Sequence, residues 1–376
     1  MLYKDPCVFV VGDEYQIAFN TLEKGIAWLE IGGETYRNSR NGLMISETLV
    51  HKISVPMDAM DSAGSYTVCF RALPERRPYF PELGTLQTKT YTFRPVKKDA
   101  PINICFLADT HSSVEAPCSA AVNMPGQTNL LILAGDIPAE SKTLEDIRAI
   151  YDLTSEITHG KIPVVFARGN HDLRGKYATE LMQYIGTRNG KTWFTFRLGS
   201  VWGIVLDCGE DKNDDHPEYG GLLDCHAMRR EETRWLRSIA DHAQEEYAAP
   251  GVTTRIAICH QPFTTEYLFD GDPGQFDIER TCYAEWTQLL NRMGIDLMLC
   301  GHSHLLASVQ PGDPLSIHPA QFPVVIAATP LRGESCPYWP LEGAGFAGSR
   351  IQINGSRVSI DAVDNIGNRE SMLCVP

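Results

Sequence analysis

Five short motifs in this chain carry side chains of the types that bind metal ions in proteins. In order, they are Asp109-Thr110-His111, Gly135-Asp136, Gly169-Asn170-His171-Asp172, His260 and Gly301-His302-Ser303-His304. Imidazole nitrogens with carboxylate and amide oxygens suit Mn, Fe or Zn, and the absence of cysteine from the motifs disfavours a closed structural zinc site. Gathered in one place, these groups would be costly to bury unless cations bound them. The motifs therefore predict a centre for two divalent metal ions.

The motifs directly follow apolar runs that are typical of buried strands. Near-continuous runs of this length suit strands covered on both faces, and stretches with helical periodicity lie between them. In open α/β sheets the carboxyl ends of strands form ligand sites, so we expect the motifs to meet. The expected strands are 102–108, 130–134, 164–167, 202–206, 255–259, 297–300, 324–327, 350–353 and 358–363, and the expected helices are 144–157, 231–246 and 284–293.

The N-terminal quarter has a different pattern. Between residues 7 and 93, short alternating apolar runs are separated by Gly, Asn and Asp, which is typical of antiparallel strands in a β-sandwich. Asp61-Ser62-Ala63-Gly64-Ser65-Tyr66 resembles the D-x-(A/G)-x-Y signature of immunoglobulin-like and fibronectin-III-like sandwiches, whose Tyr hydroxyl bonds back to the chain at a strand corner. A polar, proline-flanked linker follows at 94–101. We expect an all-β domain of this kind at 1–97 and an α/β domain at 98–376.

Composition and charge narrow the class of protein. The 376 residues suit about two domains. The net charge of -14 argues against nucleic acid and anionic membranes as partners, because basic surfaces bind both. Neither a signal sequence nor a run of about 20 apolar residues is recognisable, so we expect a cytoplasmic protein. Eleven cysteines without a C-x-x-C pair favour neither a disulfide framework nor a zinc ribbon, and Cys105, Cys259 and Cys300 are expected to be buried.

The order and types of the motif residues resemble the calcineurin-like metallophosphoesterase superfamily. Its pattern is D-x-H, G-D, G-N-H-(D/E), an isolated His and G-H-x-H, and the resemblance covers about residues 102–305. It implies a four-layer sandwich of two mixed sheets flanked by helices, and hydrolysis of a phosphomonoester or phosphodiester by a metal-bridging hydroxide. It also implies that Asp109, His111 and His304 bind one metal, that Asn170, His260 and His302 bind the other, and that Asp136 bridges them.

By the same resemblance, His171 is the catalytic acid and not a ligand. A departing alkoxide needs a proton, and a protonated histidine next to Asn170 can supply it. Asp172 either holds His171 in its orientation or caps the following helix, and the sequence leaves both roles open. Asn170 and Arg174 are expected to contact the phosphate of the substrate.

A β-domain followed by such a catalytic domain also resembles purple acid phosphatases, but two positions depart from that family. Those enzymes use G-D-x-x-Y, whose Tyr binds ferric iron, whereas the third residue after Asp136 is Ala139. They also lack the histidine that this chain has at His111. A ferric-tyrosinate site is therefore not expected.

Four further features bear on the substrate. Arg168, Arg174 and Arg332 are candidates for gripping a phosphate oxygen, since a guanidinium forks onto such oxygens. The polar stretch 209–224 could form part of the rim or a second metal cluster, although a solvated loop is favoured. In the stretch 264–280, Tyr267, Phe269 and Phe276 could shape a pocket or serve as loop anchors. The net negative charge slightly favours a small phosphate ester or a peptide as the substrate.

Two other functions stay open. One is a metal-stabilised scaffold that binds partners without catalysis, which the presence of His171 disfavours because a scaffold needs no general acid. The other is a protein Ser/Thr phosphatase, which would need an open site, whereas the stretches 209–224 and 264–280 suggest a partly walled one. The sequence does not address the oligomeric state.

Overall fold

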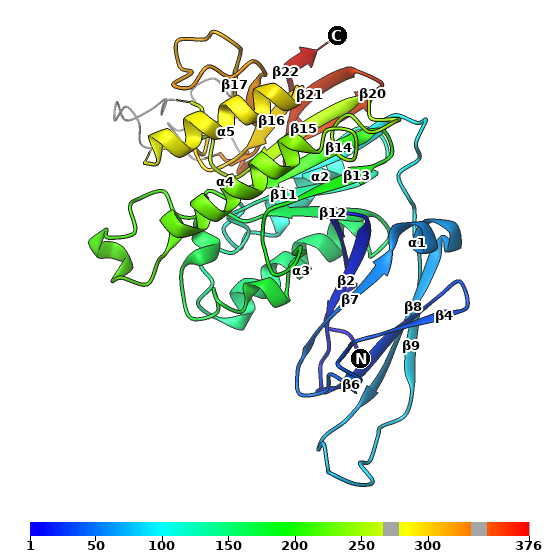
Figure 1. Ribbon diagram of the computed structural model, residues 1–376. Helices are drawn as coiled ribbons and strands as arrows, with labels where there is room; N and C mark the ends of the chain where they lie inside the picture. The colour runs from blue at the N-terminus through cyan, green and yellow to red at the C-terminus, as the bar shows by residue number, and fades with distance from the viewer. Residues whose placement is uncertain (266–277, 332–343, 376) are drawn as a thin grey trace.

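The computed structural model describes residues 1–265, 278–331 and 344–375, and two large sheets with helices packed on them form most of it (Figure 1). This is the mixed α/β class that the sequence predicts. The larger sheet has the order β22 (Arg369–Val375), β21 (Arg357–Asp364), β20 (Phe346–Asn354), β10 (Ile102–Leu107), β11 (Leu130–Ala134), β12 (Pro163–Ala167), β1 (Cys7–Val11), β2 (Glu14–Asn20) and β7 (Val50–Pro56), with β19 (Thr329–Pro330) paired to β20. The smaller sheet has the order β13 (Phe194–Leu198), β14 (Val201–Leu206), β15 (Thr254–Cys259), β16 (Leu297–Cys300), β18 (Val324–Ile326) and β17 (Ala307–Val309).

The other elements surround these sheets. A four-stranded sheet has the order β4 (Glu34–Arg37), β3 (Gly25–Ile31), β8 (Ser65–Ala72) and β9 (Gln87–Thr92), and β5 (Ser39–Arg40) pairs with β6 (Leu43–Met44). The α-helices are α1 (Met57–Ala63), α2 (Glu115–Asn123), α3 (Leu144–Thr158), α4 (Cys225–Asp241) and α5 (Arg280–Met293). Short 3-10 helices lie at His171–Leu173, Leu181–Gln183 and Pro217–Tyr219.

The smaller sheet is covered on both faces, which explains its apolar runs. In β15, Ile256 and Ile258 join a buried cluster that contains side chains of the larger sheet. The alternate residues Ala257 and Cys259 join a second cluster with residues of α4 and α5, such as Trp286. Because successive side chains of a strand point to opposite faces, both faces must be apolar. Strands β14, β15 and β16 are parallel, as are β10, β11 and β12, so within each of these sets the carboxyl ends lie at one edge.

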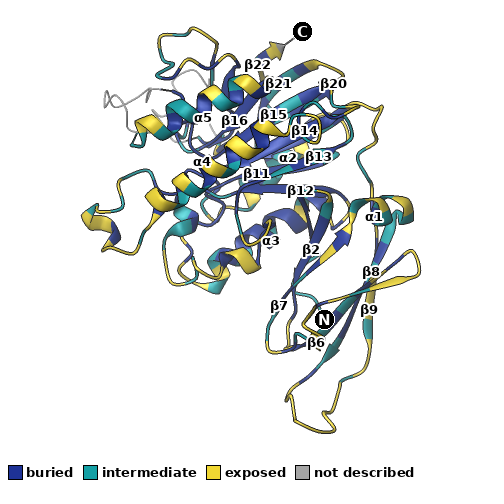
Figure 2. Ribbon diagram, in the orientation of Figure 1, coloured by how far each residue is buried: buried dark blue, intermediate teal, exposed yellow. Residues whose placement is uncertain are grey.

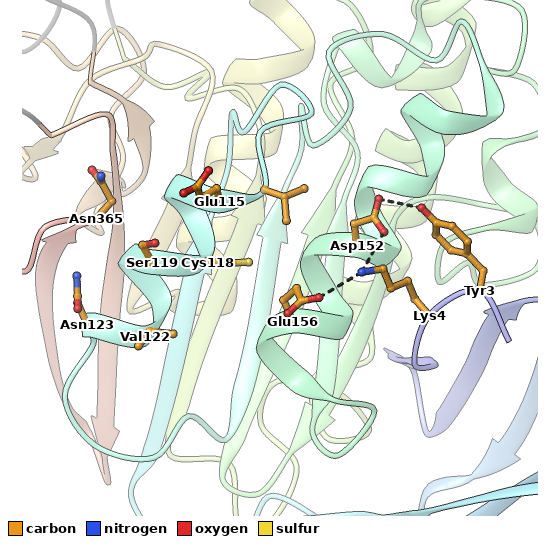
Figure 3. A pocket seen from close by; sticks show the side chains of 11 residues that line it. Tyr3, Lys4, Glu115, Cys118, Ser119, Val122, Asn123, Asp152, Glu156 and Asn365 are labelled. Carbon is orange, nitrogen blue, oxygen red and sulfur yellow. Dashed lines mark hydrogen bonds and ion pairs between the residues drawn. The ribbon is translucent and has the colours of Figure 1, made fainter.

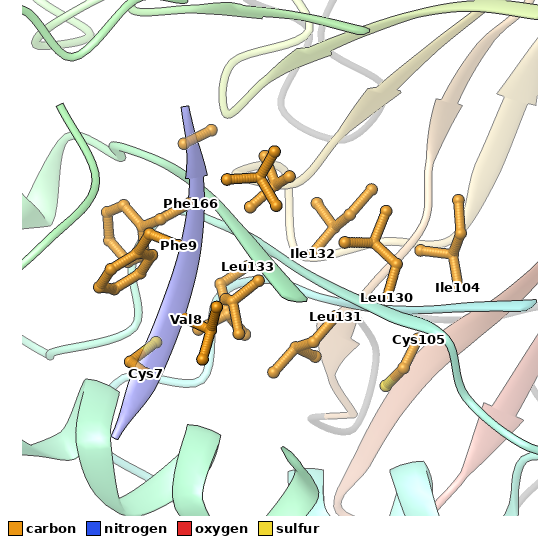
Figure 4. Packing of buried hydrophobic residues seen from close by; sticks show 14 of the residues in the cluster. Cys7, Val8, Phe9, Ile104, Cys105, Leu130, Leu131, Ile132, Leu133 and Phe166 are labelled. Carbon is orange, nitrogen blue, oxygen red and sulfur yellow. The ribbon is translucent and has the colours of Figure 1, made fainter. Parts of the chain in front are cut away.

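The N-terminal strand β1 lies inside the larger sheet. It pairs in parallel with β12, where Val8 lies opposite Pro163, and antiparallel with β2. Phe9 belongs to the same buried cluster as Leu133 and Phe166 (Figure 4). Strands β1, β2 and β7 therefore extend the larger sheet across the boundary expected at residue 97. An independent N-terminal domain that ends there stays a prediction.

Polar contacts also join the N-terminal segment to α3. The Tyr3 hydroxyl donates to Asp152 at 3.2 Å, and Lys4 Nζ lies 3.2 Å from a carboxylate oxygen of Glu156 (Figure 3). Both acidic residues belong to α3. The start of the chain is thus bound to the α/β body through side chains as well as through strand pairing.

Tyr66, the tyrosine of the sandwich signature, has a different role from the one expected. It is buried in β8, and its hydroxyl donates to the carbonyl of Gly160 at 2.8 Å. Gly160 lies between α3 and β12, so the expected bond to a nearby strand corner is wrong. The hydroxyl attaches the four-stranded sheet to the α/β body instead.

This bond gives a stability prediction. Tyr66→Phe should lower the free energy of unfolding by about 1–3 kcal/mol, because the buried Gly160 carbonyl loses its donor. Urea denaturation measures the change. Tyr79→Phe is the matched control, since Tyr79 is 81% exposed. Equal stability of Tyr66→Phe and wild type would contradict the attachment.

Helix α4 begins at Cys225, whereas the pattern predicts a start at 231. The carboxylate of Asp214 accepts hydrogen bonds from the backbone N–H groups of Cys225 (3.1 Å) and His226 (2.9 Å). The group that caps this helix thus lies outside the local sequence. Helix α3 begins at Leu144, as predicted, where Thr143 and Asp146 form a local capping box.

Two predictions from composition concern the burial of cysteines and the presence of membrane-spanning helices. Cys105, Cys259 and Cys300 are fully buried, as expected. The cysteines within the described ranges are free thiols. In those ranges, no helix has the length and apolar character needed to cross a membrane.

Candidate metal centre

The expected ligand residues lie where strands of both sheets end. The loops after β10, β11 and β12 of the larger sheet and after β15 and β16 of the smaller sheet carry all of them, as the sequence predicts. The larger sheet supplies Asp109, His111, Asp136 and Asn170, and the smaller sheet supplies His260, His302 and His304.

The backbone at several of these residues is strained. Asp109, His111, Asp136, His302 and His304 have φ values of 55°, 45°, 53°, 71° and 52°. Residues other than glycine rarely adopt this left-handed region, which costs on the order of 1–3 kcal/mol each. Strain of this kind is retained where the surrounding structure fixes it, and it gathers at functional sites.

The motif glycines have a packing role. A Cβ atom on Gly169 would lie 2.2 Å from Asp136 Oδ1, and one on Gly301 would lie 2.5 Å from Asp109 Oδ2. Any side chain would therefore displace a carboxylate that comes from another strand. This is why a glycine precedes the metal-binding residue types in these motifs.

The first group consists of Asp109, His111 and His304, whose ligand atoms all lie within 4.8 Å of one another. His304 Nε2 lies 2.9 Å from His111 Nε2 and 3.5 Å from Asp109 Oδ1. Asp109 is fully buried; its Oδ2 accepts from the N–H of His302 at 2.8 Å, but Oδ1 has no hydrogen-bond partner among the described residues. A cation between these atoms would satisfy the buried carboxylate oxygen, so the donor set fits a divalent metal.

The second group consists of Asp136, His260 and His302. His260 Nε2 lies 3.2 Å from Asp136 Oδ2 and 3.2 Å from Asn170 Oδ1. The other ring nitrogen of His260, Nδ1, donates to the carbonyl of Ala134 at 2.7 Å. This bond fixes the ring so that Nε2 faces the cluster, as in histidines that bind metals.

Asp136 lies between the two groups. It forms a third group with His111 and His171, and its Oδ1 accepts from the N–H of His171 at 2.9 Å. Burial raises the pKa of Asp136, but the charge of His260 and the hydrogen bond to it outweigh burial and hold that pKa below its usual value. A carboxylate in this place can contact a cation on either side.

Burial and nearby carboxylates set the charge states of three of the histidines. Burial lowers the pKa of His111 and of His302 to about 4, so both rings are neutral and keep a lone pair for a cation. Burial also lowers the pKa of His260, but the nearby Asp136 and Asp109 raise it to about 10. A cation would replace the proton that His260 holds between these carboxylates.

His171 and Asp172 make separate contacts. His171 Nδ1 donates to the carbonyl of Ala139 at 2.7 Å, which leaves Nε2 as the atom for proton transfer. Asp172 Oδ2 accepts from the N–H of Gly169 at 2.6 Å and of Asp136 at 3.3 Å. Burial and then the charge of Asp136 raise the pKa of Asp172 to about 8. Asp172 thus holds the loop backbone, while Ala139 orients the His171 ring.

An ion pair next to His171 was not expected from the sequence. Arg174 Nε and Nη2 lie 2.7 and 2.8 Å from the two carboxylate oxygens of Glu210. Glu210 is fully buried and also accepts from the Tyr219 hydroxyl at 2.9 Å. Arg174 Nη1 lies 3.2 Å from His171 Nε2. Glu210 therefore fixes a guanidinium beside the ligand groups.

Glu210 and Asp211 belong to the stretch 209–224, for which a solvated loop is favoured by the sequence. That prediction is wrong for this part of the stretch, since Glu210 is buried and Asp211 Oδ2 lies 3.9 Å from His302 Nε2. The stretch follows β14, which pairs in parallel with β15, so its start lies at the same sheet edge as His260. The place of the stretch directly after a predicted strand is the sequence feature that could have indicated that Glu210 and Asp211 lie at the site.

The other two arginine candidates, Arg168 and Arg332, stand differently. Arg168 Nε lies 2.7 Å from Asp207 Oδ2, which is fully buried, so this guanidinium already has a carboxylate partner and its contact with phosphate stays a prediction. Arg332 lies outside the described residues, and so do residues 266–277 with the expected pocket aromatics Tyr267, Phe269 and Phe276.

Comparison with known proteins identifies the family of this chain. The family model for calcineurin-like phosphoesterases matches residues 102–306, which is more than half of the chain. The chain belongs to the calcineurin-like phosphoesterase family. Its ligand set and its family imply that it binds divalent metal.

Curated relatives match over part of their length. The mouse protein "Serine/threonine-protein phosphatase CPPED1" is 27% identical over 146 residues, which are 38% of this chain and 42% of that protein. The human protein of the same name is 19% identical over 180 residues, 46% of this chain and 52% of that protein. The chain spans about half the length of these relatives.

Two solved structures share the fold at low sequence identity. Purple acid phosphatase PPD1 from yellow lupin (Lupinus luteus) seeds has a TM-score of 0.60 and 11% identity, and the match covers 98% of this chain and 73% of that one. PhoD has a TM-score of 0.57 and 11% identity, and the match covers 99% of this chain and 92% of that one.

Proposed function

We propose that this chain is a dinuclear-metal phosphoesterase that hydrolyses a phosphomonoester or phosphodiester. The observation that carries the proposal is the meeting of two ligand groups around Asp136, beside a buried oxygen of Asp109 that has no hydrogen-bond partner among the described residues. When bound, divalent ions such as Mn, Fe or Zn would activate a water molecule and neutralise phosphoryl oxygens. Asp109, His111 and His304 would hold one ion, Asn170, His260 and His302 the other, and Asp136 both.

In the proposed reaction, Arg174 binds the phosphate and His171 supplies the proton. The contact between Arg174 Nη1 and His171 Nε2 makes Nε2 a hydrogen-bond acceptor, since a guanidinium can only donate. A bound phosphate oxygen is a stronger acceptor than imidazole and would take the Arg174 N–H. His171 Nε2 is then free to take up a proton from solvent and to donate it to the departing alkoxide. The amide of Asn170 would add a second contact to the phosphate.

A protein Ser/Thr phosphatase is the second candidate function. The printed name of the mouse and human relatives favours it. The net charge of -14 is compatible with a peptide or with a small phosphate ester, and it disfavours long nucleic acids. We therefore propose a phosphorylated small molecule or peptide as the substrate.

We further propose the four-layer arrangement of the family for residues 98–376 and a fibronectin-III-like sandwich for residues 1–97. The two buried clusters on either side of the smaller sheet support the layers. The fold similarity to the lupin enzyme spans 98% of the chain and so includes the N-terminal strands. Strands β1, β2 and β7 would form the side of the sandwich that continues into the larger sheet.

Glu210 is expected to act as a positioning residue. Glu210→Gln removes the charge that fixes Arg174, and we expect a loss of roughly 10- to 100-fold in kcat/KM with a rise in KM, while metal content stays near wild type. Steady-state kinetics and elemental analysis measure this. Glu218→Gln is the matched control, because Glu218 is an exposed residue of the same loop. Unchanged KM and kcat in Glu210→Gln would remove this role.

Elemental analysis of the purified protein, with Mn²⁺-dependent hydrolysis of p-nitrophenyl phosphate and bis-p-nitrophenyl phosphate, tests the proposed function. About two metals per chain with turnover of either ester is the expected result. A preference between the two esters separates phosphomonoesterase from phosphodiesterase activity. Metal without turnover would favour a non-catalytic scaffold, and absence of metal would overturn the assignment of the site.

A further inference from the structure

Helix α4 carries a row of basic side chains along one face. His226, Arg230, Arg234 and Arg237 are spaced by four, four and three residues, so they share one side of the helix over roughly 16 Å. All four are exposed, whereas Leu236 on the inner side is fully buried. Exposed and buried parts alternate along the ribbon of α4 (Figure 2). A basic row is unexpected in a chain with a net charge of -14.

The row lines a groove of about 370 Å³ with residues of α5 and the segment before it. At one end of the row, His226 Nδ1 contacts Glu279, and at the other Arg237 Nε lies 2.5 Å from Glu285. Arg229 also lines the groove but is buried, and it donates to the carbonyls of Cys208 and Glu210. The ends of the row are thus neutralised within the chain.

The centre of the row is not neutralised. Arg230 and Arg234 form no ion pair and no hydrogen bond within residues 1–265, 278–331 and 344–375. Like charges four residues apart on a helix repel each other and destabilise the helix. Two adjacent guanidinium groups can fork onto carboxylate oxygens, which would remove this repulsion.

We propose that the groove between α4 and α5 binds a short acidic peptide segment of a partner protein, whose carboxylates pair with Arg230 and Arg234. Because Glu279 and Glu285 pair with the two ends of the row, only Arg230 and Arg234 remain for a ligand, which suits a short acidic segment better than a long, uniformly charged strand such as a nucleic acid. The length of the row suits only a few peptide residues. The proposal does not depend on the metal centre or on the proposed function.

Fluorescence anisotropy with a fluorescein-labelled six-residue polyglutamate peptide at low salt tests this inference. The variant Arg230→Glu/Arg234→Glu should raise the Kd by roughly 10-fold or more, because two charge pairs become repulsive. The matched control is Arg40→Glu/Arg357→Glu, which makes the same charge change at two exposed arginines and should leave the Kd within about twofold.

Far-UV circular dichroism and melting curves confirm that both double variants fold. No binding by the wild type would overturn the proposal. An equal loss of affinity in both double variants would also overturn it, because the peptide would then respond to the net charge of the protein and not to the groove. Tighter binding of a single-stranded oligonucleotide of equal charge through the same two arginines would replace the acidic peptide with nucleic acid.

Discussion

His171→Ala is expected to lower kcat for an alkyl phosphate ester by about 10²- to 10⁴-fold, the usual contribution of a general acid. The hydrogen bond from Nδ1 to the carbonyl of Ala139 fixes the ring and leaves Nε2 to donate the proton. His171 Nε2 lies 3.9 Å from Asp136 Oδ2, close to the ligand groups but outside the proposed ligand sets. The metal content of the variant should therefore stay near wild type.

The leaving group separates proton donation from other roles of His171. A p-nitrophenolate leaves without a proton, so His171→Ala should lose much less activity on p-nitrophenyl phosphate than on the alkyl ester. His242→Ala, at an exposed residue just after α4, is the control for the loss of an imidazole. If His171→Ala kept full activity on the alkyl ester, the assignment of the acid would be wrong.

The ligand cluster could be predicted from sequence because each part of it is encoded locally. A buried strand, a glycine and a metal-binding residue lie within a few positions of one another at Gly135-Asp136, Gly169-Asn170 and Gly301-His302. Parallel pairing then brings the first two ends to one edge of the larger sheet, whereas Gly301-His302 follows a strand of the smaller sheet and reaches them through the packing of the two sheets. The close approach of Asp136 Oδ1 to Gly169 explains why the pattern tolerates no side chain at that glycine.

The features that the sequence did not reveal depend on contacts between distant residues. All five residues of β1 are buried, as suits a strand covered on both faces, but a run of apolar residues does not say that its partner is β12. The Asp214 carboxylate that caps α4 and the Glu210 carboxylate that holds Arg174 likewise act on partners brought near by folding. Residue type and spacing alone could not select them from other acidic residues.

Asp136→Asn is expected to abolish both metal binding and turnover, with a loss of activity at least as large as the roughly 10²- to 10⁴-fold expected for His171→Ala. Asp136 is placed between the ligand groups and accepts from the N–H of His171. An amide of the same size can still accept that bond through its oxygen. It removes the negative charge that two cations would share and turns one oxygen into a hydrogen-bond donor, which repels a cation.

Metal content and thermal stability distinguish loss of metal from loss of fold. Added Mn²⁺ should raise the Tm of the wild type by mass action and leave that of Asp136→Asn unchanged. Asp241→Asn makes the same substitution at an exposed residue of α4 and should keep both the metal and the Mn²⁺-dependent shift. Two metals per chain in folded Asp136→Asn would show that Asp136 does not bridge them. A folded variant with neither metal nor turnover is the result expected if the carboxylate of Asp136 joins the two ligand groups.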